Sequence, residues 1–476
     1  MLSNVILISY LILTALIGAY FTKKNNSISQ FFVAKRGLGT LFVIPIVFSE
    51  IIGGNATVGI SEGAFQIGIS SVWIIWAMCI GCLLFALYTS KFFYIMSEKM
   101  GAMSVPEAFA NLFDQKTRFV VAFVLLFVYF IISGLQPLAA AAILSPMFGL
   151  NMNIIAWFVS FYFILTTILG GRKGLAWINA IHAVVMYVGL GITAIYAIKY
   201  VGGFPSLQKE LPETFFMFDQ PNLANILATI IGTGLSFLVA PTLVSACFSA
   251  KSLKAAKRGS ILGGLLVIPF VLFPAIIGIV AKAVMPNIIA KNSLILMATA
   301  ISPILTGVVS MAVIAAIFST GPSLLLIAST IITRDIYIGI INNNSSNKRQ
   351  LIVSRASILI FGVLSTYMGL QVTSIVSALS GAFQIRAIVG AVLLIALSWK
   401  RVNSKAVFWS MTIGGLVSAV WYFANNPFGI SNLWPSLLFG LITLVIITLA
   451  SKDKISSEHQ RYNSIINRST EIRMNK

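Results

Sequence analysis

The sequence predicts an all-α integral membrane protein with about 13 transmembrane helices. Hydrophobic residues make up 58% of the 476-residue chain, charged residues make up only 9%, and the mean hydropathy is +0.97. Soluble domains carry roughly 25% charged residues, so this composition excludes a large soluble enzyme and a disordered protein. The apolar runs match the roughly 20 residues that a spanning helix needs, which excludes the shorter strands of a β-barrel.

Thirteen apolar runs, separated by charged or turn-rich breaks, are predicted to cross the membrane. They cover residues 2–21, 38–59, 71–95, 119–143, 152–171, 175–199, 223–247, 259–283, 302–329, 354–371, 374–399, 406–424 and 432–450. No small-residue cleavage site follows the first run, so we expect it to be a span and not a removable signal peptide. The polar tail of residues 452–476 is expected to be poorly ordered.

The distribution of basic residues predicts an outside N-terminus and a cytoplasmic C-terminus. Of the 32 lysines and arginines, 27 fall on one side of the alternating spans, four fall on the other side, and Arg386 lies within a span. Short loops rich in Lys and Arg stay in the cytoplasm. The net charge of +20 therefore reflects topology and indicates no nucleic-acid partner. We expect a monomer in the inner or plasma membrane.

Two spans contain helix-breaking and small polar residues near their middle. The run 38–59 contains Ser49-Glu50 and Gly53-Gly54-Asn55, and the run 223–247 contains Gly232-Thr233-Gly234, Ser236 and Pro241. Glycine lowers the cost of unwinding a helix, and broken backbone is tolerated in lipid only where it lines a cavity. For either span alone, close helix packing through small residues is the alternative.

The spacing of the two spans favours interrupted helices. They are five spans apart, so they occupy equivalent positions in two five-span repeats, and the odd number inverts the second repeat. Paired interrupted helices in an inverted repeat mark a secondary-transporter site at the bilayer midplane. The predicted segments are a first helix with its lead-in (1–37), the first repeat (38–200), an extracellular loop (201–222), the second repeat (223–400), two C-terminal helices (401–451) and a cytoplasmic tail (452–476).

A cluster of hydroxyls lies in the run 302–329, where Ser319 and Thr320 precede Gly321, Pro322 and Ser323. Such hydroxyls often bond to carbonyls of their own helix. The alternative is a Na⁺ site, because Na⁺ is a hard cation that prefers oxygen ligands. Two hydroxyls, one carbonyl of the same helix and the freed carbonyls of an unwound partner helix would supply about five neutral oxygens.

Several segments resemble the sodium:solute symporter family, which includes proline, pantothenate, acetate, sialic acid and sugar symporters. The matching residues are Ala316-x-x-Ser319-Thr320 with Thr333-Arg334-Asp335-Ile336-Tyr337, Phe31-Phe32-Val33-Ala34-Lys35-Arg36-x-Leu38-Gly39, Gly170-Gly171 with Ala176-Trp177-Ile178-Asn179-Ala180-Ile181-His182, and the lysine-rich loop 250–256. The resemblance covers residues 1 to 450. It implies a LeuT-like 5+5 inverted-repeat core, transport by alternating access, no enzymatic activity, and Na⁺ as the coupling ion without a cofactor.

The resemblance also implies where Na⁺ binds. The site would lie between the first and eighth helices of the repeats. Its side-chain ligands would be Ser319 and Thr320, and its backbone carbonyl ligands would be those of Ala316, Ser49 and Ile52.

The chain departs from the family pattern on the predicted ion path. Where the family usually has an aspartate and, three residues later, a glutamine, this chain has Asn179 and His182. The neutral amide of Asn179 lacks the negative charge with which an aspartate attracts Na⁺. The sequence therefore leaves open a transporter-like sensor in which the coupling of solute to Na⁺ is degraded. A histidine titrates near physiological pH, so proton coupling is a second alternative. His182 is otherwise a satisfied polar residue near the inner mouth.

Glu50 and Arg386 are the ionisable residues that lie deepest in the predicted spans. A lone charge at the bilayer centre costs about 2.5–3.5 kcal/mol, so we expect both to face the protein interior. One hypothesis is a salt bridge between them. The other is that Arg386 binds a substrate carboxylate as a bidentate fork, while Glu50 balances the charge or meets a substrate amine.

Further candidates for contact with the solute are polar, aromatic or glycine residues in or near the interrupted spans. They are Gly53, Asn55, Gln66, Trp73, Tyr129, Gln136, Ser236 and Gln384. Together the sequence predicts a Na⁺-coupled symporter in the lipid bilayer that imports a small polar organic solute. A carboxylate, an amino acid or a related zwitterion is the substrate hypothesis.

Overall fold

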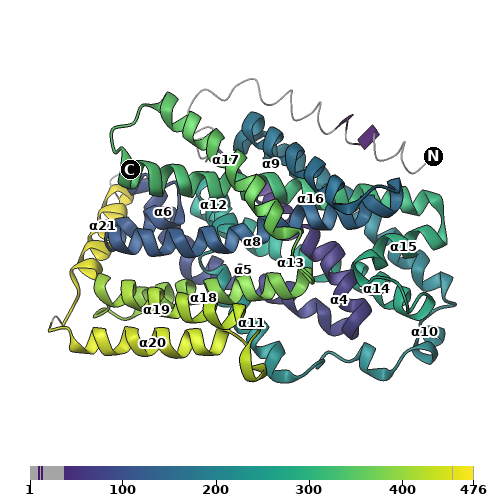
Figure 1. Cartoon of the computed structure of the whole chain (residues 1–476). Helices are drawn as coiled ribbons and strands as arrows, with labels where there is room; N and C mark the ends of the chain where they lie inside the picture. Colours follow the sequence, from purple (N-terminus) through teal and green to yellow (C-terminus); the bar gives the residue numbers. More distant parts are fainter. Residues whose placement is uncertain (1–8, 11, 14–36, 453, 475–476) are drawn as a thin grey trace.

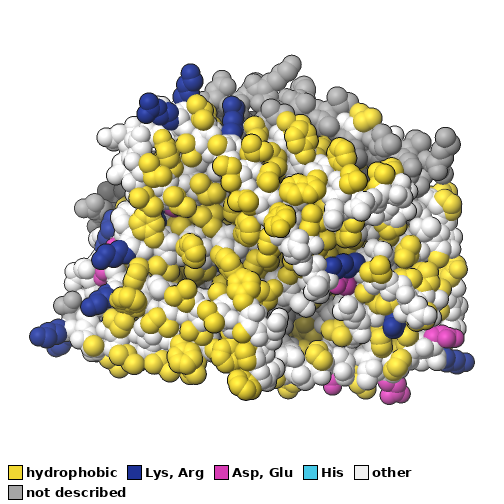
Figure 2. All heavy atoms as spheres, in the orientation of Figure 1, with side chains coloured by type: hydrophobic (Ala, Val, Ile, Leu, Met, Phe, Trp, Pro, Cys, Tyr) yellow, Lys and Arg dark blue, Asp and Glu magenta, His cyan; other side chains and the backbone are white. Residues whose placement is uncertain are grey.

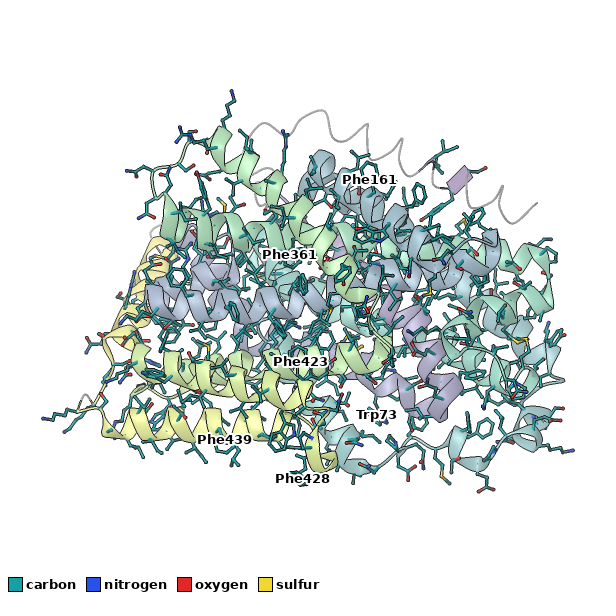
Figure 3. All side chains as sticks on the ribbon, in the orientation of Figure 1. Trp73, Phe161, Phe361, Phe423, Phe428 and Phe439 are labelled. Carbon is teal, nitrogen blue, oxygen red and sulfur yellow. The ribbon has the colours of Figure 1, made fainter. Side chains whose placement is uncertain are left out.

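The computed structural model consists of long, closely packed helices (Figure 1). It describes residues 9–10, 12–13, 37–452 and 454–474, except the side chains of Glu50 and of residues 169–178 and 468–474. The predicted first span, 2–21, and the motif residues 31–36 thus lie almost wholly outside the described residues. Exposed rings such as those of Phe161 and Phe439 lie along the outside of the bundle (Figure 3), where a membrane protein meets lipid.

Within the described ranges, ten helices are long and apolar enough to cross a membrane. Most of them fall into two series of helices. The first series is α3 (Thr40–Ile51), α4 (Ile60–Ile67), α5 (Trp73–Leu84), α6 (Ser90–Met100), α8 (Gln115–Phe148) and α9 (Met152–Tyr200). The second is α11 (Leu223–Phe237), α12 (Pro241–Ser249), α13 (Leu253–Phe270), α14 (Leu272–Val284), α16 (Pro303–Ile331), α17 (Asn347–Gly369) and α18 (Ile375–Ser398).

Two more long helices, α19 (Ser404–Phe423) and α20 (Leu433–Ala450), follow the second series. Short helices are α7 (Val105–Leu112), α10 (Phe204–Glu210) and α15 (Ser293–Ile301). The multi-span all-α prediction is confirmed, but the number of 13 spans is not. One reason is that the stretch Asn55–Met100 is counted as one span where the sequence predicts parts of two.

Contacts between the two series follow the predicted inversion. The helix that opens each series packs against the third helix of the other, because α3 contacts α13 and α11 contacts α5. Likewise α16 contacts α9, and α8 contacts α17 and α18. A two-fold relation between inverted repeats produces such reciprocal pairs.

The predicted spans 152–171 and 175–199 fall in one helical run, α9, whose apolar parts are 152–168 and 179–200. In the first part the Thr167 hydroxyl donates a hydrogen bond of 3.3 Å to the Pro322 carbonyl of α16. In the second part Gly189 lies against Ala312, closer to the start of α16. Both parts of α9 therefore pack on α16.

The polar tail differs from the prediction of poor order, because α21 (Ser457–Met474) docks on the rest of the chain. Glu458 accepts hydrogen bonds from the backbone N–H of Ser404 (3.2 Å) and from its hydroxyl (2.5 Å). Burial acts to raise the pKa of Glu458, but these hydrogen bonds bring it below its ordinary value. The Tyr462 ring packs 6.0 Å from that of Phe92. Tail composition alone does not reveal such long-range contacts.

Charge separates along the visible face of the molecule. In Figure 2 hydrophobic side chains cover the middle, and most visible Lys and Arg side chains lie at the left and upper left, near α21 and the start of α17. This basic end is the face that the positive-inside rule assigns to the cytoplasm. The orientation of the termini stays a prediction.

Candidate functional site

The first interrupted helix breaks where the sequence predicts. Helix α3 ends at Ile51, the chain leaves helical geometry at Ile52 and Gly53, and it resumes as a π-helical turn, Asn55–Gly59, that leads into α4. The backbone carbonyls just before the break consequently lose their partners within the helix.

Gly53 and Gly54 permit a close approach of α8 to this break. A Cβ atom at Gly53 would lie 2.7 Å from Oε1 of Gln136, and a Cβ atom at Gly54 would lie 2.3 Å from Cβ of Ala139. The Gln136 side chain then forms hydrogen bonds with polar groups of the unwound segment. Its Oε1 accepts from the backbone N–H of Gly54 at 2.9 Å, and its Nε2 donates to Oδ1 of Asn55 at 3.2 Å.

Replacing Gln136 with alanine is expected to destabilise the protein by about 1–3 kcal/mol, since it leaves the buried N–H of Gly54 without an acceptor. The thermal unfolding midpoint of detergent-purified protein, without Na⁺ or solute, measures this loss. Gln66→Ala is the matched control because Gln66 is exposed. Equal midpoints for the two variants would show that the break does not depend on Gln136.

The second interrupted helix breaks at Pro241, the last of the helix-breaking and small polar residues that the sequence places in this span. Gly232 and Gly234 are helical within α11, which ends at Phe237, and α12 begins at Pro241. Proline lacks an N–H and its ring clashes with the carbonyl four residues earlier, so it sets the break. The glycine provides close packing instead, because a Cβ atom at Gly232 would lie 2.9 Å from Cγ of Gln384.

The two breaks lie at similar depth. The start of α3 and the end of α12, which are the ends furthest from the breaks, are joined by two backbone hydrogen bonds. These run from Leu38 N–H to the Ser249 carbonyl (3.0 Å) and from Lys251 N–H to the Leu38 carbonyl (2.8 Å). From there α3 runs for 12 residues and α12 for 9 residues. These lengths correspond to about 18 and about 14 Å, close to half the roughly 30 Å hydrocarbon thickness.

Five oxygens from α3 and α16 meet beside the first break. Ser319 Oγ lies 3.0 Å from the Ser49 carbonyl and 2.7 Å from the Ala316 carbonyl. Thr320 Oγ1 lies 2.9, 3.1 and 3.4 Å from the carbonyl oxygens of Ser49, Ala316 and Ile52. All five residues are buried. The structure thus brings together the whole predicted oxygen set, and several of its bonds cross between the helices.

The chemistry of this oxygen cluster suits a hard monovalent cation. All five groups are neutral oxygens, and each hydroxyl has lone pairs for a cation as well as its donated proton. No group of three or more His, Cys, Asp or Glu side chains able to hold a metal ion occurs among the described residues.

A chamber of about 30 Å³ lies next to the oxygen cluster. Asn55, Tyr129, Thr320 and Arg386 all line it. Thr320 belongs to both the chamber and the oxygen cluster, so the two are direct neighbours. The volume holds roughly two water molecules, and the chamber is therefore nearly closed in this conformation.

Arg386 forms a buried wall of the chamber and is only 2% exposed. Its Nε donates to Ser236 Oγ at 2.7 Å, and its guanidinium also bonds to the Tyr129 hydroxyl. The guanidinium carbon lies 5.1 and 5.7 Å from the ring centres of Phe383 and Phe237. Among the described side chains no carboxylate pairs with Arg386.

The predicted salt bridge between Glu50 and Arg386 stays untested, because the Glu50 side chain lies outside the described part of the chain.

Three further candidates lie away from the chamber. Two positions along a helix rotate the side chain by about 200°, so Gln384 points away from Arg386 and lines a different pocket. Gln66 is exposed at the end of α4. Trp73 donates from Nε1 to the Phe218 carbonyl in the loop after α10. The sequence alone did not distinguish these three residues from the candidates that line the chamber.

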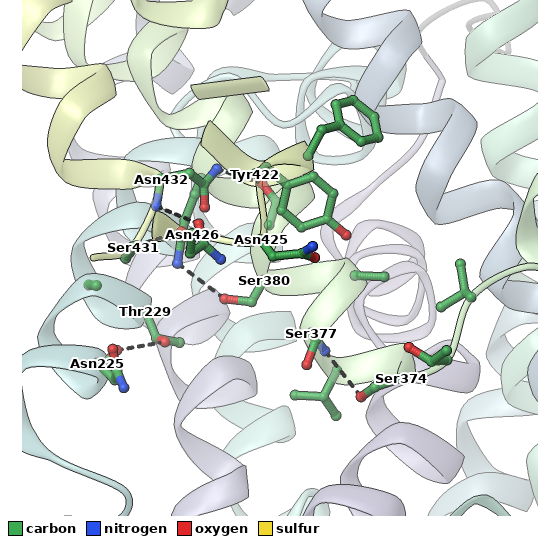
Figure 4. A pocket seen from close by; sticks show the side chains of 18 of the residues that line it. Asn225, Thr229, Ser374, Ser377, Ser380, Tyr422, Asn425, Asn426, Ser431 and Asn432 are labelled. Carbon is green, nitrogen blue, oxygen red and sulfur yellow. Dashed lines mark hydrogen bonds between the residues drawn. The ribbon is translucent and has the colours of Figure 1, made fainter. Parts of the chain in front are cut away.

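The pocket that contains Gln384 is wide and polar. It has a volume of about 680 Å³, and its hydroxyl and amide side chains come from α11, the start of α18 and the segment between α19 and α20 (Figure 4). The labelled lining residues are Asn225, Thr229, Ser374, Ser377, Ser380, Tyr422, Asn425, Asn426, Ser431 and Asn432. Phe237 of the chamber lies about 12 Å further along α11 than this pocket.

One buried and one partly buried ion pair close the opposite, basic end. Arg118 Nε lies 2.8 Å from Asp335 Oδ1, which also accepts from the Ser104 hydroxyl at 2.9 Å. Arg334 pairs with Glu107 at 2.5 Å. These bonds join α7 and α8 to the helical extension of α16. Sequence reasoning missed Arg118 and Glu107, since their partners Asp335 and Arg334 lie 217 and 227 residues further along the chain.

One of the two predicted ion-path residues, Asn179, lies beside the oxygen cluster. The backbone carbonyl of Asn179 accepts from Ser49 Oγ at 3.0 Å, and the buried Asn179 amide has no hydrogen-bond partner among the described residues. His182 is also buried, and its Nδ1 hydrogen-bonds to the hydroxyl of Tyr10.

Comparisons with known proteins agree with this geometry. The model of the sodium:solute symporter family matches residues 31–414. The sodium/proline symporter of Escherichia coli (strain K12) is 25% identical over 470 residues, covering 94% of this chain and 93% of that protein. The osmoregulated proline transporter OpuE of Bacillus subtilis (strain 168) is 22% identical over 477 residues, covering 95% and 96%.

Two solved structures show the same fold. A Na⁺-coupled sialic acid symporter in a substrate-bound, outward-open state superposes with a TM-score of 0.77 at 19% identity, covering 94% of this chain and 96% of that chain. Mhp1, a nucleobase-cation-symport-1 family transporter in a closed conformation, gives a TM-score of 0.58 at 14% identity, covering 93% and 99%. The predicted LeuT-like fold is confirmed.

Proposed function

The chain belongs to the sodium:solute symporter family, and from this premise we propose that it imports a small carboxylate or zwitterion together with Na⁺ by alternating access. As a family member it is a Na⁺-coupled membrane transporter and not an enzyme, with Na⁺ as coupling ion and no cofactor. The finer proposal rests on one observation, which is that buried Arg386 and the oxygen cluster share a single chamber.

The oxygen cluster is the proposed Na⁺ site. Its ligands would come from α3 and α16, so the bound ion would hold these helices together. An ion that binds one arrangement of the two helices more tightly shifts the protein toward that arrangement. Because Thr320 also lines the chamber, solute and ion would stabilise the same state and each would raise the affinity for the other.

Arg386 is the proposed recognition group for a substrate carboxylate. No carboxylate among the described side chains pairs with this buried guanidinium, and a bidentate substrate carboxylate would offset the cost of burying it with two charge-assisted hydrogen bonds. Asn55 and Tyr129 add polar groups around the same chamber. The small chamber must widen to admit a solute, which favours compact substrates. Both named relatives are proline transporters, so proline is the first solute to test.

The polar pocket and the ion pairs support a direction of entry. Solute would reach the chamber from the pocket at the face opposite the basic end, while the Arg118–Asp335 and Arg334–Glu107 pairs hold the basic end closed. Release to the cytoplasm would require those pairs to separate. The basic end would be cytoplasmic, with the N-terminus outside and the protein acting as a monomer.

Two alternatives share the fold. Proton coupling would use His182, but its bond to Tyr10 and its burial favour a structural role. A transporter-like sensor with degraded coupling would reflect the neutral Asn179 on the ion path.

A thermal-shift screen of the detergent-purified chain tests the proposal. Small metabolites, starting with proline and its amide, are added with either Na⁺ or K⁺ as the background salt. A ligand that binds the folded state stabilises it by RT ln(1 + [L]/Kd), about 2.7 kcal/mol at 100 times Kd. We expect a carboxylate or zwitterion to raise the unfolding midpoint more in Na⁺ than in K⁺.

Equal shifts in both salts would contradict Na⁺ coupling. Uptake into vesicles driven by a pH gradient in Na⁺-free buffer would favour the proton-coupled alternative instead.

A further inference from the structure

Two cavities outside the transport path lie one after the other between α8 and α19. The helices are parallel neighbours (Figure 1), because a Cβ atom at Gly415 would lie 3.3 Å from Val124, and further along the Phe127 and Phe423 rings are 5.9 Å apart. Both helices begin at the basic end of the molecule. A surface that follows them therefore runs from the membrane interface toward its centre.

The first cavity, here called the head pocket, lies at the start of both helices and has a volume of about 720 Å³. Its charged lining consists of Lys116, Lys405, Asp114 and Glu458. Both lysines are exposed, and neither forms an ion pair with any carboxylate whose side chain is described. Among the described lining residues, two positive and two negative groups thus surround one pocket, and their charges balance.

The two carboxylates keep acceptor capacity. Asp114 Oδ1 accepts from the backbone N–H of Thr117 at 2.8 Å, and Glu458 is held by Ser404 and Ser457. An ionised carboxylate has about four acceptor positions, so each group still has positions for an additional donor. These bonds also use backbone N–H groups at the starts of α8 and α19. The two lysines are therefore the groups of the lining that remain to bind an anionic part of a ligand.

The second cavity, here called the chain groove, lies further along the same helices and has a volume of about 360 Å³. Its lining begins at Phe119, one turn after Lys116, and reaches Phe423 (labelled in Figure 3) at the end of α19. Thr412 supplies the one hydroxyl of the lining, and it is bonded to its own helix at 2.8 Å. Phe123 is 72% exposed, so the groove opens toward lipid.

We propose that the head pocket and chain groove bind one phospholipid with a phosphoethanolamine headgroup. Lys116 and Lys405 would pair with its phosphate, Asp114 and Glu458 would accept hydrogen bonds from its primary ammonium, and an acyl chain would fill the groove. The balanced charge fits a zwitterion better than an anionic lipid. A choline headgroup carries no N–H and cannot donate to the carboxylates. Trp409 in the head pocket is typical of the interface depth.

The same lipid would connect the tail to the transporter. Glu458 and Ser457 belong to the start of α21, whereas the lysines belong to α8 and α19. A headgroup held by both sets would therefore stabilise the docked position of α21 on the basic face.

Native mass spectrometry of the full chain in detergent tests this site. Phosphatidylethanolamine, phosphatidylcholine and phosphatidylglycerol with identical acyl chains are titrated separately. We expect one tightly retained phosphatidylethanolamine per chain. The Lys116→Ala/Lys405→Ala variant should weaken its retention by roughly tenfold or more, since a lysine at the surface contributes strongly to headgroup attraction. Glu458→Gln should reduce the preference over phosphatidylcholine.

The matched control is Lys254→Ala/Lys348→Ala, which removes the same charge at exposed positions away from the groove. It should retain the lipid as the natural chain does. Equal retention of the three lipids, an unchanged affinity in the Lys116/Lys405 variant, or stronger retention of phosphatidylglycerol would each overturn the proposal. So would a thermal shift from free phosphoethanolamine or inorganic phosphate as large as that from the lipid, since the groove would then play no part.

Discussion

Replacing Thr320 with alanine is expected to raise the Na⁺ concentration for half-maximal uptake by about 10- to 100-fold. A hydrogen-bonding group that serves a charge is worth about 1.5–3 kcal/mol, and every 1.4 kcal/mol is a factor of ten. Thr320 reaches three carbonyls from two helices and also lines the chamber. Its loss should therefore weaken both Na⁺ binding and the dependence of solute binding on Na⁺. Ser319→Ala should act in the same direction.

Two companion variants separate a ligand role from a structural one. Ser310 lies on the same helix, is fully buried and bonds to the Thr306 carbonyl of its own helix at 2.7 Å, so Ser310→Ala is the matched control. Thr320→Ser keeps the hydroxyl and should restore most of the Na⁺ affinity. Initial uptake rates over a range of Na⁺ concentrations measure all of these variants. A normal Na⁺ dependence in both Ser319→Ala and Thr320→Ala would remove the assignment.

Helical periodicity explains why the oxygen cluster was predictable from sequence. Residues 319 and 320 follow residue 316 by three and four positions, so in a helix both hydroxyls lie next to the residue 316 carbonyl of the preceding turn. The Gly53-Gly54 pair marked the break that frees the partner carbonyls. Local chemistry and one family resemblance were sufficient there, and the structure places all five oxygens within reach of one another.

Features that depend on long-range partners were not predictable in the same way. The close packing of Gly232 against Gln384 of α18 depends on a helix about 150 residues further along the chain, so the sequence around Gly232 does not reveal it. Gln384 and Arg386 are two residues apart, yet helix geometry sends them to different cavities. The tail docks through Glu458 on Ser404, a contact that its polar composition does not foreshadow.

Replacing Arg386 with lysine is expected to weaken solute binding by about 10- to 100-fold while Na⁺ binding alone stays close to normal. Lysine keeps the positive charge but loses the planar fork, the bond from Nε to Ser236 and the stacking between Phe237 and Phe383. Binding of the solute and of its neutral amide is measured by thermal shift in Na⁺. The natural chain should strongly prefer the carboxylate, and Arg386→Lys should lose most of that preference.

The comparison between carboxylate and amide decides whether Arg386 touches the solute. If Arg386 only neutralised Glu50, then Arg386→Lys and Glu50→Gln would change stability, and the ratio of carboxylate to amide affinity would stay constant. If it holds the carboxylate, the loss should be large for the carboxylate and small for the amide, because a neutral amide offers the guanidinium one acceptor oxygen and no charge. Arg118→Lys gives a matched buried arginine, since Arg118 pairs with Asp335 outside the chamber. Arg118→Lys should lower stability and leave the ratio of carboxylate to amide affinity unchanged. An equal change of this ratio in both lysine variants would show that Arg386 acts on the fold and not on solute recognition.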